Sequence, residues 1–367
     1  MNLINDDIIF EIFKFLPVSG ILIMGEINKR FLKISRNRIW PIVFMSKNCE
    51  FTNKILSNYT FESYEFYHDI QDLSIIKNNF KSKGYVTAQD HKIIKGFHKF
   101  KFFDTINIPN CDIPKSCFKY LTECKNVNIF NCESITDSEI IYLKNCHKIN
   151  LDFCNNITDK GFKELKNCYS LKLTCTKITD DAVKELNCDY LDLSYCKITN
   201  DGIKNLKCKK LILSGCIVTD DVIKNFIGDN LDMSRCNYVT DEGIESIKCT
   251  KLVIGAGSNL TFTNINKLQC VKLDVSFTSI NDEHLKTFKD FKSLNITGCH
   301  YITDNGLIYL RNCEKLIMMH CPQITDLGIE ILNCKKIIIC ERMEFSCINK
   351  RITICKCSLN ICSLIEC

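Results

Sequence analysis

The sequence predicts an α/β fold in which short strand–helix units stack into a solenoid, with a curved parallel sheet on one side and outer helices on the other. Three observations predict this fold. An alternating apolar–polar run recurs every 20–22 residues, a Thr-Asp pair follows most of these runs, and apolar residues at helical spacing follow the pair. The first 45 residues depart from this period and carry a helical pattern. They predict a small all-α module before the solenoid.

The repeat sets the domain organisation. The first apolar residues of successive runs are Ile106, Val127, Ile149, Leu171, Leu191, Leu211, Leu231, Leu252, Leu273, Leu294, Leu316 and Ile337. A four-residue strand and a two-turn helix cannot bury their apolar sides alone, whereas stacked copies can. Residues 106–342 are therefore predicted to form about 11 units. We expect residues 46–105 to be a bridging, partly helical segment and residues 343–367 a degenerate C-terminal cap.

Each helix is expected to begin at the Thr-Asp pair, because Thr is a favourable N-cap residue and Asp is favourable in a first helical turn. Ile203 and Leu206, three residues apart, then give the helix one inward side. The pairs are Thr158-Asp159, Thr219-Asp220, Thr240-Asp241, Thr303-Asp304 and Thr325-Asp326.

Most of the 26 cysteines occupy two fixed positions of the repeat. One set lies five residues after the first apolar position: Cys111, Cys132, Cys154, Cys196, Cys216, Cys236, Cys299 and Cys321. The other lies three residues before the next unit: Cys124, Cys146, Cys168, Cys188, Cys208, Cys249, Cys270, Cys313 and Cys334. We interpret both sets as buried, reduced packing residues with weak S–H donors. The alternatives are disulfides between neighbouring strands and a metal site in the C-terminal cysteine cluster.

With these residues in place, the array resembles leucine-rich repeats of the cysteine-containing type. In that type, an Asn or Cys turns inward at the end of the strand, near backbone groups of the adjacent unit. The resemblance implies a solenoid with a broad inner surface for protein binding, and no catalysis.

The N-terminal module resembles an F-box. Its order and spacing are followed by Leu3, Ile8, Ile12, Leu16, Pro17, Leu22, Ile27, Phe31 and Trp40. Ile4 and Asn28 depart from the pattern, where Pro and Cys are common. The resemblance implies that residues 1–45 dock onto a Skp-type adaptor. The alternative is a helical cap for the solenoid.

Motifs for catalysis and for cofactor binding are missing from the sequence, and no cofactor or metal is predicted. The net charge of +5 comes from 48 basic and 43 acidic residues spread along the chain. That balance argues against a nucleic-acid partner, and we expect no membrane association. A cytoplasmic protein is expected, with the nucleus as an alternative compartment.

The repeat register also predicts a target-binding surface. Acidic residues recur between the two strand leucines, and large residues recur just before the first cysteine position. Aromatic residues and arginine dominate binding hot spots, whereas the alternative is that these are scattered exposed side chains. The predicted residues are Phe153, Asp192, Tyr195, Asp232, Arg235, Asp274 and Phe277.

The two resemblances together imply a substrate-recognition subunit of a cullin–RING ubiquitin ligase of the SCF type. The F-box would recruit the adaptor and ligase, and the repeats would hold an unknown target protein. A repeat scaffold or inhibitor that binds one protein without recruiting a ligase is the alternative.

Overall fold

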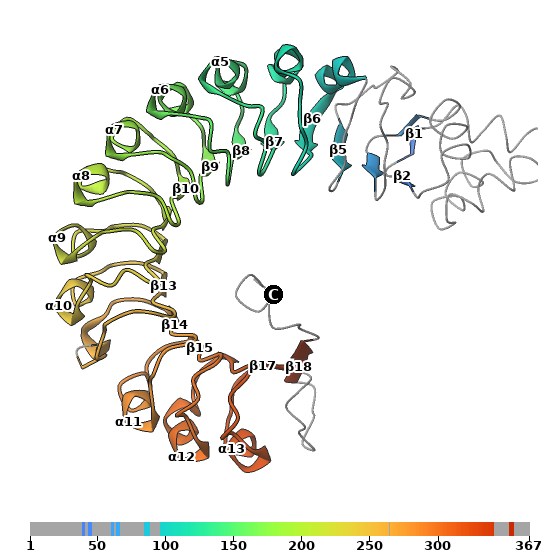
Figure 1. Cartoon of the computed structure of the whole chain (residues 1–367). Coiled ribbons are helices and arrows are strands. Elements are labelled where there is room, and N and C mark those ends of the chain that lie inside the picture. Colours follow the sequence, from blue (N-terminus) through green and yellow to red (C-terminus); the bar gives the residue numbers. More distant parts are fainter. Residues whose placement is uncertain are drawn as a thin grey trace, which may run out of the picture. The chain divides into compact units, whose positions relative to one another are not determined.

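The computed structural model describes residues 96–340, apart from residue 264, and six short strands outside that range. The chain divides into two compact units, which we describe separately. Unit 1 comprises residues 1–178 and 185–188, and unit 2 comprises residues 179–184 and 189–367. Within each unit, the strands line one side of the stack and the helices line the other (Figure 1).

Unit 1 is a parallel ladder of short strands. Its main sheet has the order β2 (Val43–Met45), β4 (Tyr64–Phe66), β5 (Gly84–Ala88), β6 (Phe103–Asn107), β7 (Asn126–Asn128), β8 (Lys148–Asn150) and β9 (Ser170–Lys172). A separate pair joins β1 (Ile39–Trp40) to β3 (Thr60–Phe61). The helices are η2 (Phe97–Phe102), η3 (Lys115–Leu121), α5 (Asp137–Ile140), η4 (Ile141–Leu143), α6 (Asp159–Phe162) and η5 (Lys163–Leu165), where η denotes a 3-10 helix.

Unit 2 repeats the same pattern. Its strands pair in chain order: β10 (Tyr190–Asp192), β11 (Lys210–Ile212), β12 (Asn230–Asp232), β13 (Lys251–Val253), β14 (Lys272–Asp274), β15 (Ser293–Asn295), β16 (Lys315–Ile317), β17 (Lys336–Cys340) and β18 (Ile352–Cys355). The helices are α7 (Asp180–Val183), α8 (Asn200–Ile203), α9 (Asp220–Ile223), α10 (Asp241–Ile244), η6 (Ile265–Lys267), α11 (Asp282–Leu285), α12 (Asp304–Leu307), η7 (Ile308–Leu310) and α13 (Asp326–Glu330).

The strand register confirms the predicted fold class. Leu191 is the ladder partner of Leu211, which in turn pairs with Leu231. All three side chains are at most 4% exposed, so one apolar position of each repeat stacks into a continuous core. A single repeat would leave these apolar side chains in water, whereas stacking of neighbouring repeats buries them.

The parallel ladder extends upstream of the predicted first unit. Val43 pairs with Tyr64, Tyr64 with Val86, and Val86 with Ile106, which are intervals of 21, 22 and 20 residues. The segment 46–105 therefore contains strands at the repeat period, as well as η2. Its strands read TF, YEF and GYVTA and lack leucine, so the leucine alignment did not reveal them.

The predicted F-box lies outside the described residues, except for β1 and β2. These two strands fall within a module expected to be all helical, so the structure differs from the expectation there. Their sequences, IW and VFM, are made largely of β-branched and aromatic residues that favour strands. Of the predicted adaptor-binding residues, only Trp40 lies in a described element, in β1. The others are Leu3, Ile8, Ile12, Leu16, Pro17, Leu22, Ile27 and Phe31.

A last strand lies in the segment predicted to be a degenerate cap. Ile337 of β17 pairs with Ile352 of β18 after an interval of only 15 residues. The shortened unit still adds a strand to the ladder, and so covers an edge of β17 that would otherwise have unpaired backbone groups.

The repeat cysteines are buried packing residues, as predicted, except that Cys270 is only half-buried. Cys216 and Cys236 are at most 2% exposed, and each donates its S–H to the carbonyl of the preceding unit's strand, Leu193 or Leu213, at 3.1 Å. Burial raises the pKa of Cys236 to about 12, which disfavours the reactive thiolate. The cysteines of residues 96–340 form no disulfides.

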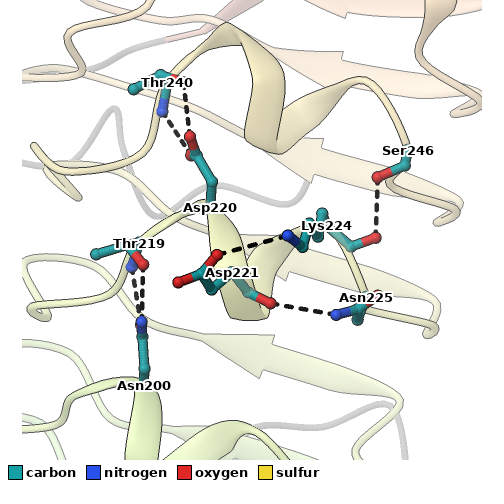
Figure 2. Close-up of polar contacts among 8 residues, drawn as sticks. All are labelled: Asn200, Thr219, Asp220, Asp221, Lys224, Asn225, Thr240 and Ser246. Carbon is teal, nitrogen blue, oxygen red and sulfur yellow. Dashed lines mark hydrogen bonds and ion pairs between the residues drawn. The ribbon is translucent and has the colours of Figure 1, made fainter.

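The Thr-Asp pair does more than begin a helix. Asp220, the first residue of α9, accepts hydrogen bonds from the backbone nitrogen and hydroxyl of Thr240 in the next repeat, at 2.7 and 2.6 Å (Figure 2). Thr240 in turn accepts a hydrogen bond from the backbone of Glu242 and caps α10. We call this contact between consecutive repeats the Asp–Thr staple. It joins Asp137 to Thr158, Asp180 to Thr199, Asp282 to Thr303 and Asp304 to Thr325 in the same way.

A glycine two residues after the Thr-Asp pair makes room for the staple. A Cβ atom on Gly243 would lie 2.2 Å from the Oδ1 atom of Asp220, and one on Gly202 would lie 2.4 Å from that of Asp180. Neither distance is possible without movement. The Thr-Asp-x-Gly pattern is therefore explained by contact between neighbouring repeats as well as by helix capping.

Candidate protein-binding surface

The predicted acidic residues lie on alternate strands of unit 2. Asp192 ends β10, Asp232 ends β12 and Asp274 ends β14. Two strand spacings separate consecutive carboxylates, which is roughly 10 Å. All three residues are half-buried, so the strip is less exposed than its alternation with the buried leucines predicted.

The partial burial has a structural cause. The Oδ1 atom of each aspartate accepts a hydrogen bond from the backbone nitrogen two residues later, at 2.9–3.0 Å. This local bond ends the strand and begins the turn. The donors are Ser194, Ser234 and Ser276. Each aspartate thus has a structural role whether or not it also meets a partner.

Electrostatics single out the central carboxylate. Burial raises the pKa of Asp232 above its ordinary value, bonds from the backbone and side chain of Ser234 oppose the rise, and the charges of Asp274 and Asp192 add to it. A cation brought to this strip would relieve that repulsion.

The predicted large residues occupy a strained backbone position. Phe153, Tyr195, Arg235 and Phe277 have φ between 57° and 61°, in the left-handed region. A left-handed conformation costs a residue with a Cβ roughly 1–2 kcal/mol. Elsewhere the same column holds Asn110, Asn131, Gly215 and Gly298, which tolerate it better, and also Cys175 and His320.

These side chains contribute little to the core in return for the strain. Phe153 is 39% exposed, Tyr195 51% and Phe277 43%, and Arg235 is also exposed. An exposed aromatic residue at a strained position that glycine or asparagine would fill more favourably indicates a role outside folding.

Two glycines support the aromatic rings, and the sequence analysis missed this role. A Cβ atom on Gly215 would lie 2.8 Å from Cδ1 of Tyr195, and one on Gly298 would lie 2.4 Å from Cδ1 of Phe277. The rings of Tyr195 and Phe277 therefore each lie against the backbone of the next repeat. The signal was present in the sequence as a glycine one repeat after Tyr195 and after Phe277.

The predicted residues do not all lie in one unit. Phe153 belongs to unit 1, where its ring makes an edge contact with Phe130 at a centroid distance of 5.2 Å. Asp192, Tyr195, Asp232, Arg235, Asp274 and Phe277 all belong to unit 2. We call these six residues the aromatic–acidic face.

Two further features were searched for in the described residues. No group of three His, Cys, Asp or Glu side chains there is placed to hold a metal ion. Among the described helices, none combines the length and apolar character needed to cross a membrane.

A leucine-rich-repeat family model matches residues 190–207, 230–248 and 290–310. The matched segments are leucine-rich repeats. The three matches fall on the β10–α8, β12–α10 and β15–α12 parts of unit 2, where the strand leucine and the Thr-Asp or Thr-Asn cap are both present. No curated protein sequence matches the chain.

Solved structures with similar folds include other leucine-rich-repeat assemblies. The mouse RP105/MD-1 complex matches 84% of this chain and 60% of that chain, at 14% identity and a TM-score of 0.53. The yeast Rad7 and Elc1 complex matches 70% and 83%, at 15% identity and a TM-score of 0.47. An internalin from Listeria monocytogenes matches 74% and 82%, at 18% identity and a TM-score of 0.46. At these identities the likeness concerns the fold alone.

Proposed function

We propose that this leucine-rich-repeat protein is the substrate receptor of a cullin–RING ubiquitin ligase, and that the aromatic–acidic face holds the target protein. The observation that carries target binding is the row of exposed aromatic side chains kept at left-handed backbone positions. A rigid stack presents these side chains with little loss of conformational entropy on binding.

The chemistry of the face favours a target segment that carries Lys or Arg. Tyr195 and Phe277 would supply most of the contact area, and the carboxylates would orient the segment and speed association. Phe153 extends the proposal to unit 1 as a further target-binding residue.

The ligase half of the proposal rests on the F-box resemblance of residues 1–45. Leu3, Ile8, Ile12, Leu16, Pro17, Leu22, Ile27, Phe31 and Trp40 would meet the Skp-type adaptor. A scaffold or inhibitor that binds a target without recruiting a ligase is the second candidate, because the aromatic–acidic face would serve either role.

Co-expression of the full chain with a Skp-type adaptor tests the ligase half. The wild-type chain should co-purify with the adaptor, and Leu16→Asp should abolish the complex because a buried charge without a partner costs several kcal/mol. Leu327→Asp is the matched control, because Leu327 is 70% exposed in α13 and the same substitution there should leave adaptor binding intact. Failure of the wild-type chain to bind the adaptor would leave the scaffold function in its place.

A further inference from the structure

Charge is sorted between the two sets of turns in unit 2, although the net charge of the chain is small. The turns that lead into β11 and β13, and the first residues of β11, β13 and β14, carry Lys207, Lys209, Lys210, Lys248, Lys251 and Lys272, which we call the basic rim. The turns and first helical residues on the other side of the strands carry Asp201, Asp220, Asp221, Asp241, Glu242 and Asp282. Lysines therefore outnumber carboxylates along the edge at which the strands begin, although Asp189 and Asp229 lie on that edge as well.

An exposed aliphatic side chain lies in the middle of the basic rim. Ile227 is 82% exposed, the highest value among the large hydrophobic residues that are exposed in the described part of the chain. It forms an isolated parallel bridge with Lys248 of the next repeat. Lys207 occupies the equivalent position one repeat earlier, three residues before the first residue of β11. Ile227 is thus flanked by a lysine on either side.

The lysines beside Ile227 keep their charge available. Lys207 and Lys248 are exposed and form no ion pair with any residue that the structure describes, whereas Lys209 pairs with Asp189 at 2.6 Å. Lys251 and Lys272 are direct ladder partners. Like charges at such positions destabilise a sheet.

We propose that the basic rim binds an acidic polypeptide segment in an extended conformation, with one apolar residue between two carboxylates. The apolar residue would cover Ile227, and the carboxylates would meet Lys207 and Lys248. Two strand spacings separate these lysines, about 10 Å, whereas residues four apart in an extended chain are about 13 Å apart. The long lysine side chains span the difference.

The composition of the rim favours a polypeptide over other polyanions. A single-stranded nucleic acid binds through aromatic side chains that stack on bases, and the residue at the centre of the rim is aliphatic. Lysine also lacks the planar fork with which arginine recognises phosphates and base edges. The residues of the proposed contact, Lys207, Ile227 and Lys248, are not part of the aromatic–acidic face, so this inference does not depend on the ligase proposal.

Fluorescence anisotropy with the full chain and labelled peptides tests the proposal. A peptide with the core Glu-Ser-Leu-Ser-Glu should bind more tightly than matched peptides in which both Glu become Gln or the Leu becomes Ser. We expect a loss of about fivefold in affinity in each case, equivalent to about 1 kcal/mol. Added salt should weaken the Glu peptide most.

Matched variants locate the site. The double variant Lys207→Gln/Lys248→Gln and the single variant Ile227→Ser should each weaken the Glu peptide about fivefold, since both remove one half of the contact. The control is Lys204→Gln/Lys224→Gln, which removes the same charge from lysines already paired with Asp201 and Asp221. It should change affinity less than about twofold.

Two outcomes would overturn the proposal. One is equal loss in the control and in the rim variants, which would mean that only overall charge matters. The other is rim-dependent binding of a single-stranded oligonucleotide or of phosphatidylserine vesicles in the absence of binding to the Glu peptide. Circular dichroism of each variant should match the wild type, because all five side chains are exposed.

Discussion

Asp220 of one leucine-rich repeat accepts two hydrogen bonds from Thr240 of the next, one from its backbone nitrogen and one from its hydroxyl (Figure 2). Asn200 joins Thr219 with the same geometry, through its amide oxygen at 2.9 Å and its amide nitrogen at 2.7 Å. The staple therefore needs a short side chain with two polar atoms, and a negative charge is optional.

Substitution of Asp220 should separate these requirements. Asp220→Asn should keep both bonds and leave the free energy of unfolding nearly unchanged. Asp220→Ala should lower it by about 1–2 kcal/mol, because two bonds between repeats are lost. Urea unfolding followed by circular dichroism measures both. Equal destabilisation by the two variants would show that the charge, rather than the geometry, is what matters.

Gly243→Ala should destabilise the protein, although alanine favours helices by about 1 kcal/mol over glycine. The added Cβ would collide with the staple carboxylate of Asp220. In the Asp220→Ala background the overlap with the carboxylate is absent and only the 3.1 Å approach to the backbone Cα atom at that position remains, so the same substitution should there destabilise much less. A double-mutant cycle in urea measures this coupling, and additive effects would contradict the steric explanation.

Tyr195→Gly should separate folding from target binding. Glycine relieves the left-handed strain at φ 57°, so the unfolding free energy should stay level or rise by about 1 kcal/mol. Binding of the target should weaken by more than about 1 kcal/mol, as expected for a hot-spot aromatic. Targets captured by proximity labelling with wild-type and Tyr195→Gly chains provide the binding readout, and unchanged capture would place the target elsewhere.

Asp232→Asn should change the dependence of stability on pH. The raised pKa of Asp232 means that the folded state binds a proton more readily than the unfolded state, so the carboxylate costs stability at neutral pH. Asparagine should therefore stabilise the fold at pH 7. This advantage should shrink as the pH falls through the raised folded pKa toward the unfolded value of about 3.9. Thermal unfolding across this range measures it, and a constant difference would rule out titration of Asp232 as the cause.

Packing residues offer a contrast within one repeat. Leu213→Ala should cost about 2–5 kcal/mol through the cavity it leaves in the stacked core. Cys216→Asn should be mild by comparison, because an amide can also donate to the carbonyl of Leu193 that Cys216 contacts at 3.1 Å. Urea unfolding compares the two, and an equal loss would contradict the assignment of Cys216 as a replaceable donor.

The sequence was sufficient for features that recur with one residue type, such as the leucine ladder and the cysteine positions. It was insufficient where the repeat continues with other residues, as at Tyr64 and Val86, because those strands take their place from backbone pairing, β4 with β5 and β5 with β6. The role of Gly243 needed the neighbouring repeat, since its constraint comes from Asp220.

The charge argument shows a different limit. A net charge of +5 indicates no charged surface when the chain is taken as a whole. Lys207 and Asp201 lie only six residues apart in the sequence, but Asp201 is in α8, which follows β10, whereas Lys207 is in the turn that leads into β11. Sorting charges by their position in the repeat would have revealed the basic rim.

The Asp–Thr staple has a consequence for how such a chain can change over generations. Five staples use the same acceptor, Asp, and the same donor, Thr, so this contact between two repeats does not depend on which of these repeats meet. Unequal recombination within the gene could remove or duplicate one repeat and still leave matched partners at the new junction. The array can thus gain or lose length as a modular series, while positions such as Tyr195 and Ile227 diverge independently.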